Sequence, residues 1–388
     1  MDRMPIHRDL YEPTARRASW PDYIHADRVI GMTPHPLSRD PLELAIAWAE
    51  AGQPAALATV IATWGSSPRP SGSMMAVSDT GRIEGSVSGG CVEASVVDSA
   101  ATIMRENTSE ILSYGITSEQ AWSVGLACGG ELDILVESVG PAGTLTLAMA
   151  QQAIALRRAR QPVLLATRLS DRHHVLVTRT EQGLETPIND PPPDALRPAL
   201  EQAFRDGRSQ RVEDADGATW FLHLLTPPHR LLIVGAVHIA QVLAPLAMAT
   251  GFATTVIDPR TQLATPERFP GIVLMTDWPD EALENVNIDD HTAIVTLTHD
   301  PKLDDPTLHA ALNSPAFYIG ALGSRKTQAS RMARLRAEGF DTDRTARIHG
   351  PIGLAIGAVG APEIALSILA EIVAVRRDAP LARDSGWG

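Results

Sequence analysis

A thiol lies within a short loop of small residues in the first quarter of the sequence. The loop is Ser86-Val87-Ser88-Gly89-Gly90-Cys91-Val92-Glu93, between a predicted strand over 83–87 and a predicted helix over 92–106. A cysteine at a helix start lies among unpaired backbone N–H groups at the positive end of the helix dipole, which lowers the pKa of its thiol. Cys91 is therefore a candidate nucleophile or soft metal ligand. The alternative is a small buried thiol at a tight turn, where the glycines give the backbone room.

A glycine turn follows a predicted strand in the second half. Residues 231–234 form a strand-like run that ends at Gly235, and Asp258 lies 23 positions after that glycine, at the end of the next run. In a dinucleotide site the glycine allows a tight turn and the acid bonds the ribose hydroxyls. Val237 replaces the second glycine and would crowd the pyrophosphate, and Pro245 is expected to kink or shorten the next helix. Two interpretations stay open: ordinary dinucleotide binding, and a fold that uses the same crevice differently.

Further polar residues gather where the strands of this half are predicted to end. Because the carboxyl ends of parallel strands line one crevice, the polar residues of four strand ends can meet around one ligand. The segment 323–326 opens a predicted helix, and its serine, arginine and lysine suit a phosphate. The alternative is a serine cap with a solvated basic turn, and histidines satisfied by local backbone bonds. The candidates are His238, Asp258, Arg260, His299, Asp300, Gly320, Gly323, Ser324, Arg325, Lys326, His349 and Gly350.

The elements around Cys91 form a predicted α/β domain over residues 41–225, with its loops on one side of a sheet. A second thiol, Cys128, precedes Gly129 and Gly130 at the start of a predicted strand. Residues 139–225 are expected to complete this domain. The predicted elements are helices over 41–51, 92–106 and 144–160 and strands over 56–63, 74–77, 83–87, 131–137, 163–168 and 174–179.

Consecutive prolines in the segment 226–229 predict a linker, after which apolar strands alternate with helices. This pattern predicts a parallel sheet covered on both faces, so residues 229–377 are expected to form a doubly wound, Rossmann-like domain. Residues 1–40 are predicted to be a surface arm or partly disordered, and 378–388 a short tail. Strands are expected at 231–234, 254–257, 272–275, 293–297, 317–319 and 347–349, and helices up to 249 and near 326–339 and 361–376.

Composition limits the classes of function. The chain has 388 residues, 44% of them hydrophobic, and a net charge of -13, which argues against nucleic acids and acidic membranes as partners. Two cysteines are too few for a disulfide-stapled fold. With no apolar stretch after a basic start and no run long enough to span a membrane, the protein is expected in the cytoplasm.

Several unusual segments, in order, give the sequence a resemblance to the XdhC/CoxI family, accessory proteins of molybdenum hydroxylases such as xanthine dehydrogenase. The similarity covers about residues 41–377. One departure concerns Val237, because family members usually carry Gly-Ala-Gly-His where this chain has Gly-Ala-Val-His. The segments that carry the resemblance are 65–70, with Ser67 and Arg69, 85–93, 125–130, 297–304, 318–326 and 348–354.

The resemblance implies a protein that binds molybdenum cofactor, protects it while a cysteine desulfurase replaces a molybdenum oxygen by sulfur, and delivers it to an apo-hydroxylase. Molybdopterin carries a phosphate and a sulfur-bound metal, so a carrier needs an anion-binding loop and a soft ligand. The loop 86–91 is expected to supply both, with Cys91 as the tentative molybdenum contact and Cys128 as the next candidate. The cofactor-binding candidates of the first half and of the glycine turn are Ser67, Arg69, Ser86, Ser88, Gly89, Gly90, Cys91, Glu93, Gly129, Gly130 and Gly235. A homo-oligomer, most simply a dimer, is also expected. The alternative function is an NAD(P)-dependent oxidoreductase that uses the Rossmann-like domain.

Overall fold

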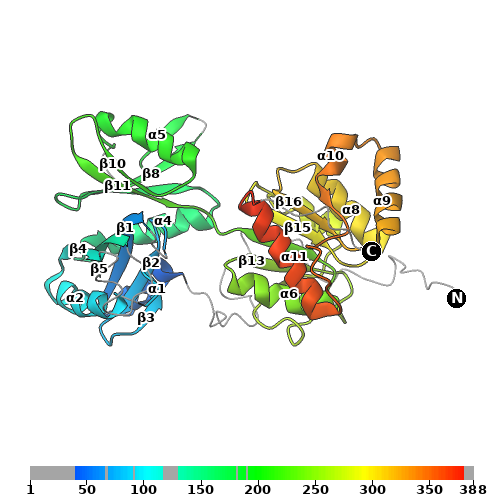
Figure 1. Cartoon of the computed structure of the whole chain (residues 1–388), viewed down its shortest axis with the longest axis horizontal. Helices are drawn as coiled ribbons and strands as arrows, with labels where there is room; N and C mark the ends of the chain where they lie inside the picture. The colour runs from blue at the N-terminus through cyan, green and yellow to red at the C-terminus, as the bar shows by residue number, and fades with distance from the viewer. Residues whose placement is uncertain are drawn as a thin grey trace. The chain divides into compact units, whose positions relative to one another are not determined.

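The computed structural model describes residues 40–65, 69–90, 92–116, 130–180, 182–188 and 191–379 (Figure 1). These residues form two compact units that divide between Pro227 and Pro228. Within the described ranges, no helix is both long and apolar enough to cross a membrane.

The first unit contains a largely antiparallel sheet in the order β3-β2-β1-β5-β4, with the short β6 parallel to β5. Successive β1 side chains point to opposite faces. Ala56 and Ala58 therefore pack with α2, whereas Ala55 and Leu57 pack with α1 and α4. The elements are α1 (Pro41–Glu50), β1 (Ala55–Gly65), β2 (Met74–Ser78), β3 (Ile83–Gly85), α2 (Glu93–Glu106), β4 (Ser109–Ile116), β5 (Gly130–Gly140), β6 (Leu145–Thr146) and α4 (Leu147–Arg158).

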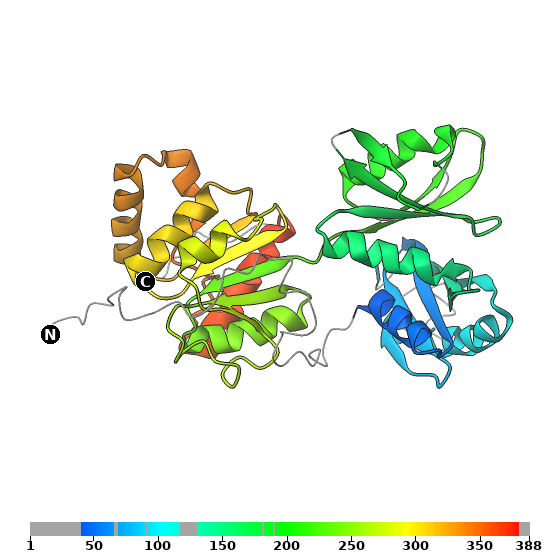
Figure 2. The same cartoon turned by 180° about the vertical axis from the view of Figure 1, so that it is seen from behind.

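A second antiparallel sheet in the order β10-β11-β7-β8-β9 completes this unit. Helix α4 packs against both sheets, through a core that joins Leu57 of the first to Leu165 of the second (Figure 2). The sequence pattern did not predict that residues 163–225 form a sheet of their own. The elements are β7 (Val163–Arg168), β8 (His174–Thr180), β9 (Gly183–Glu185), the 3-10 turn η3 (Asp194–Leu196), α5 (Arg197–Asp206), β10 (Gln210–Glu213) and β11 (Thr219–Leu225).

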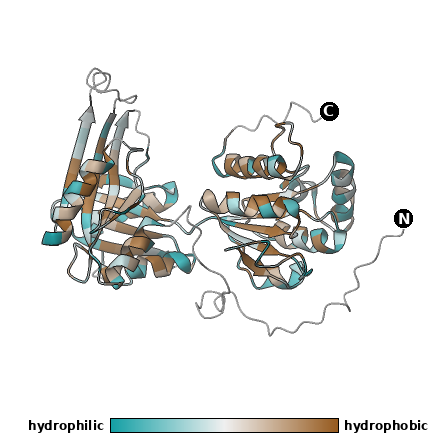
Figure 3. Cartoon of the chain, turned by 90° about the horizontal axis from the view of Figure 1, so that it is seen from below, coloured by the Kyte–Doolittle hydropathy of each residue, from teal (hydrophilic) through white to brown (hydrophobic). Residues whose placement is uncertain are grey.

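The second unit is a parallel sheet in the order β14-β13-β12-β15-β16-β17. Numbered along the chain, this is the 3-2-1-4-5-6 order of a doubly wound dinucleotide-binding fold, which confirms the predicted class. Helices α6 and α11 cover one face, and α7 and α8 the other; the hydrophobic strands between them are brown in Figure 3. The strands are β12 (Arg230–Val234), β13 (Ala253–Ile257), β14 (Val273–Met275), β15 (Thr292–Thr296), β16 (Tyr318–Ala321) and β17 (Ile348–His349).

The helices of this unit follow the predicted pattern and add to it. Helix α6 continues through Pro245 to Ala249, so the proline does not shorten it. Helix α9 starts with Ser324 as its cap. The helices are α6 (His238–Ala249), α7 (Pro279–Glu284), α8 (Pro301–Leu312), α9 (Arg325–Ala337), α10 (Thr342–Ala346) and α11 (Ala361–Arg376).

Candidate functional site

Two connections, those after β1 and β4, leave the first sheet from the same end. Gly130, the first residue of β5, pairs with Gly65 at the end of β1 and with Ile116 at the end of β4. Strand β3 also runs in the direction of β1, because each is antiparallel to β2, but Gly85 pairs with Met75, which lies opposite Ala58, so the loop after β3 starts well before this end. The pairing therefore places Gly65 and Gly130, which belong to two of the segments that carry the family resemblance, side by side, whereas the third segment, 85–93, begins elsewhere on the sheet.

Some predicted site residues on these connections lie outside the described residues: Ser67, Cys91, Cys128 and Gly129. Arg69 is described and is exposed.

The loop after β3 folds around the side chain of Glu93, the first residue of α2. Glu93 Oε1 accepts hydrogen bonds from the Ser86 hydroxyl at 2.8 Å and from the backbone N–H groups of Ser88 and Gly89, each at 3.0 Å. Its Oε2 accepts from the Ser88 hydroxyl at 2.5 Å and from the N–H groups of Gly90 at 2.9 Å and Val92 at 3.2 Å. One carboxylate therefore takes six hydrogen bonds from the loop that precedes it.

The glycines make this arrangement possible. Gly89 and Gly90 have φ values of 102° and 117°, which residues with a Cβ rarely adopt, and successive N–H groups can then converge on one anion. Partial burial opposes ionisation of Glu93, but the hydrogen bonds from Ser88 and Ser86 outweigh it and hold the pKa of the carboxyl well below its usual range. The carboxylate is thus ionised at every physiological pH.

This geometry corrects one expectation about the loop. The sequence predicts N–H groups that are open to an anion of the cargo, whereas those of Ser88, Gly89, Gly90 and Val92 already point at a carboxylate of the chain itself. No local pattern distinguishes a glutamate that binds a ligand from one that folds back onto its own loop.

The second sheet supports the connection between β1 and β2. His223 on β11 is 5% exposed, and its Nε2 lies 3.1 Å from the carbonyl oxygen of Gly72. Burial lowers the pKa of His223 to about 4, so the ring is neutral at pH 7 and its Nε2–H can donate to that carbonyl. A buried neutral histidine therefore holds the base of the segment that contains Arg69.

In the second unit, the glycine turn lies at the topological switch point between β12 and β15. Gly235 has a φ of 113°, and a Cβ placed there would lie 2.6 Å from Cγ2 of Thr298. The first glycine of the predicted motif is thus required both by its backbone conformation and by the close approach of the neighbouring loop.

Asp258, the predicted ribose ligand, is buried directly after the carboxyl end of β13. It is 0% exposed. Its Oδ1 accepts from the backbone N–H and Nε of Arg260 at 2.9 and 2.8 Å, and its Oδ2 from the Ala236 N–H and Arg260 Nη2, both at 2.7 Å. Each oxygen of the carboxylate therefore accepts two hydrogen bonds from the chain itself. Asp258 fixes the glycine turn to Arg260, and its burial leaves it inaccessible to a ribose hydroxyl.

The loop after β15 presents His299 above a buried ion pair. His299 is exposed and has a φ of 63°, a conformation that costs energy for a residue with a side chain. Beneath the loop, the Thr298 hydroxyl donates to Asp304 at 2.6 Å, and Arg331 Nη2 lies 3.3 Å from the same carboxylate. Burial raises the pKa of Asp304 in spite of these partners. Arg331 also donates to the Leu322 carbonyl at 2.9 Å, so it ties this loop to the one after β16.

The starts of α8 and α9, next to this crevice, are capped by side chains, whereas the start of α6 has no side-chain cap. Asp300 accepts from the Lys302 N–H at 3.0 Å at the start of α8. Ser324 accepts from the Thr327 N–H at 3.1 Å at the start of α9, where Arg325 and Lys326 are exposed. His238, the first residue of α6, is exposed as well.

Glycines let the loop after β17 approach β16 and α9 closely. A Cβ on Gly350 would lie within 2.5 Å of the Gln328 side chain on α9, and one on Gly320 would lie 2.4 Å from Cδ1 of Ile352. Gly323 directly precedes the Ser324 cap.

A network that the sequence pattern did not reveal anchors His349. Its Nδ1 lies 3.0 Å from Glu371 Oε1, and Glu371 Oε2 accepts from the Tyr318 hydroxyl and the Gly353 N–H, both at 2.7 Å. Burial alone would raise the pKa of Glu371, but these hydrogen bonds together lower it to about 2. The sequence did hold one signal for this network: Glu371 is an acid between Ile368 and Ile372 on the buried face of α11.

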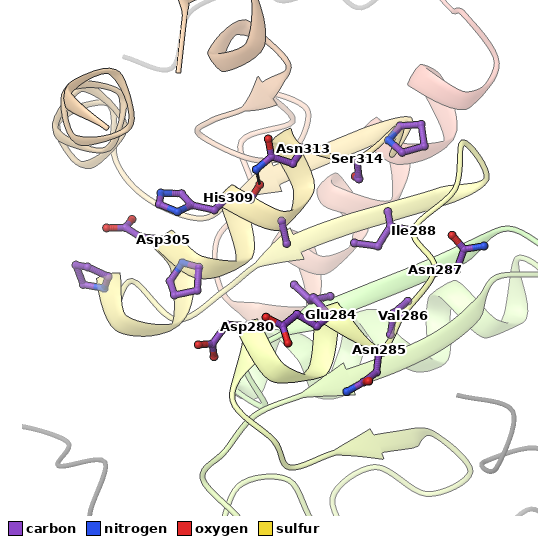
Figure 4. A pocket seen from close by; sticks show the side chains of 15 residues that line it. Asp280, Glu284, Asn285, Val286, Asn287, Ile288, Asp305, His309, Asn313 and Ser314 are labelled. Atoms are coloured by element: carbon purple, nitrogen blue, oxygen red, sulfur yellow. Dashed lines mark hydrogen bonds between the residues drawn. The ribbon is translucent and has the colours of Figure 1, made fainter. Parts of the chain in front are cut away.

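A groove of about 1010 Å³ lies elsewhere on this unit, between α7 and α8, and contains none of the predicted site residues (Figure 4). Asp280, Glu284 and Asp305 line it, together with His309 and Asn313. Among the described residues, no group of three or more His, Cys, Asp or Glu side chains could hold a metal ion.

The fold and these sites define a two-unit α/β protein whose second unit is a Rossmann-type domain. Residues 231–372 match the XdhC Rossmann domain, and residues 48–115 match the XdhC and CoxI family. The chain is 30% identical over 335 residues to the molybdenum cofactor insertion chaperone PaoD of Escherichia coli (strain K12), a match that covers 86% of this chain and 87% of that protein. It therefore belongs to the XdhC and CoxI family, which confirms the resemblance.

Two further similarities extend over most of the chain. A probable xanthine dehydrogenase subunit of Bacillus subtilis (strain 168) is 29% identical over 327 residues, or 83% of this chain and 93% of that protein. A crystal structure described as a xanthine dehydrogenase of Bacillus halodurans matches with a TM-score of 0.70 and 26% identity, over 89% of this chain and 98% of that one. The similarity thus includes both units.

Proposed function

We propose that this protein is an accessory factor that binds molybdenum cofactor as its cargo and inserts it into a molybdenum hydroxylase of the xanthine dehydrogenase type. The observation that carries the proposal is the identity to a molybdenum cofactor insertion chaperone over 86% of the chain. The pairing of Gly130 with Gly65 and Ile116 supports it, because it brings the connection that contains Cys128 to the same end of the first sheet as the connection that contains Arg69.

Cys91 and Cys128 are the proposed contacts for the molybdenum or its sulfur, since thiolates are soft ligands and sulfur carriers. The sequence puts Cys91 between Gly90 and Val92, whose N–H groups the structure fixes on Glu93. We further propose that a cysteine desulfurase is the source of the sulfur, that the protein works in the cytoplasm, and that it forms a dimer.

The crevice of the Rossmann domain is the proposed second contact with the cargo. Arg325 and Lys326 at the start of α9 carry exposed positive charge, and a helix start favours a phosphate. His299 lies on the loop after β15, and His349 is the last residue of β17. Nothing in this assignment requires a nicotinamide cofactor.

An NAD(P)-dependent oxidoreductase is the competing function, favoured by the 3-2-1-4-5-6 strand order. The buried carboxylate of Asp258, which accepts four hydrogen bonds from the chain itself, and the branched side chain of Val237 argue against it. Titration of NAD and NADP into the full chain separates the two functions, and saturable binding at micromolar cofactor would favour the oxidoreductase.

The test of the proposed function is transfer of cofactor from the purified protein to an apo-hydroxylase. Wild-type protein is expected to restore hydroxylase activity, and Cys91→Ala to lower it at least about tenfold, because a soft ligand to the cargo is lost. Cys128→Ala is the matched variant, since it removes the other thiol of the chain. Equal activation by wild type and Cys91→Ala would remove Cys91 from the mechanism.

A further inference from the structure

The described residues of the loop 86–92, which are 86–90 and 92, form an anion-binding nest that the chain fills with its own carboxylate. Backbone N–H groups of Ser88, Gly89, Gly90 and Val92 converge on Glu93, at distances between 2.9 and 3.2 Å. Loops of this geometry in other proteins hold phosphates or metal clusters. Here the anion is tethered at the first position of α2, where the helix dipole also favours negative charge.

The hydroxyl groups of the loop are used in the same way. Ser86 donates to Oε1 of Glu93 and accepts from the Gly89 N–H at 3.1 Å, whereas Ser88 donates to Oε2 and accepts from the Val92 N–H at 3.2 Å. The side chains and the backbone thus form one network with a single anion at its centre. Hydrogen bonds to an ionised group are about twice as strong as neutral ones, so this network fixes the loop.

We infer that Glu93 is a positioning residue, not a ligand of the cargo: its carboxylate is the permanent anion that holds the backbone on both sides of Cys91. Gly90 and Val92, which flank Cys91 in the sequence, both donate to the same oxygen, Oε2. A phosphate of the cargo would have to displace a tethered carboxylate that receives six hydrogen bonds, so it binds elsewhere. The inference rests on the proposed function for its consequence in cofactor binding, but the state of the loop is testable without cofactor.

The experiment removes the tethered anion and supplies a free one. In full-length Glu93→Ala, amide hydrogen exchange of the peptide that contains Ser88, Gly89 and Gly90 is expected to accelerate about 10- to 100-fold. This factor corresponds to the net free energy that charge-assisted hydrogen bonds contribute. Sodium formate is expected to restore protection, because its carboxylate can occupy the vacated nest, and sodium chloride at the same ionic strength is not. Rescue by a free carboxylate would not follow from a general loss of packing.

Two further variants keep the test decisive. Glu106→Ala removes an exposed acid from the other end of α2 and is expected to leave exchange in the loop unchanged. Glu93→Gln keeps the size of the side chain if Glu93→Ala does not fold, and its amide leaves one acceptor oxygen in place of two. It is expected to show intermediate protection.

Molybdopterin retention is measured on the same samples. Wild type is expected to retain it, Glu93→Ala to lose it, and formate to restore it in part. Wild-type exchange rates in Glu93→Ala, or a failure of formate to restore protection, would overturn the inference. Absence of molybdopterin from the wild type would refute the proposed function, while the exchange rates would still decide the role of Glu93.

Discussion

Acid is expected to destabilise the first unit through His223. The ring is buried, and its pKa falls from 6.5 to about 4 in the folded state. Folding therefore favours the neutral ring, and the associated stability is present in full above pH 6.5 and is lost as the pH falls toward 4. A shift of this size corresponds to about 3 kcal/mol of unfolding free energy in total, of which about 2 kcal/mol is already lost at pH 5.

The matched variant is His223→Gln, which does not titrate and retains a donor toward the Gly72 carbonyl. Hydrogen exchange of β11 peptides reports the unfolding free energy of this unit separately from that of the Rossmann domain. Between about pH 7.5 and pH 5, wild type is expected to lose about 2 kcal/mol more than His223→Gln, because the variant lacks only this titration. Parallel losses in the two proteins would refute the argument that burial of His223 controls the acid sensitivity.

Two further predictions concern the Rossmann domain. Gly235→Ala is expected to lower its unfolding free energy by about 2 to 4 kcal/mol, because the backbone has a φ of 113° and the new methyl group would lie 2.6 Å from a neighbouring atom. Gly251→Ala is expected to cost only about 1 kcal/mol, because its φ is 87° but the space around it is open. Chemical denaturation followed by exchange in β12 measures both, and equal losses would show that the contact is unimportant. Arg331→Met is expected to cost about 3 to 5 kcal/mol by leaving Asp304 buried without its cationic partner, and the double variant with Asp304→Leu to cost less than Arg331→Met alone. A double variant that is less stable than Arg331→Met would contradict this.

The sequence predicted the Rossmann domain well because each strand and helix of this domain shows its own pattern within a short stretch of the chain. Short apolar runs separated by helices define parallel strands, and the crossover rules then leave few arrangements. The second sheet of the first unit was missed because antiparallel pairing of β7 with β11 joins residues that are far apart in the sequence, such as Arg168 and Trp220. No periodicity within 163–168 or 219–225 indicates such a partner.

The candidate site was predictable in its residues but not in their partners. The motifs around Glu93 and Asp258 are visible in the sequence, and each acid was expected to face a ligand. In the structure both carboxylates turn inward, toward the loop 86–92 and toward Ala236 and Arg260. Whether an acid binds a ligand or braces its own loop depends on side-chain direction, which residue spacing does not encode.

Native mass spectrometry of the full-length protein, purified from cells that make molybdenum cofactor, tests the central proposal most directly. We expect a mass increase equal to molybdopterin or its molybdenum form. The fraction of protein that carries this mass is expected to fall in Cys91→Ala and to fall less in Cys128→Ala. The same spectrum reports any extra sulfur atom bound to the chain. A protein that carries no pterin under these conditions, or one that carries NAD or NADP instead, would contradict the proposal.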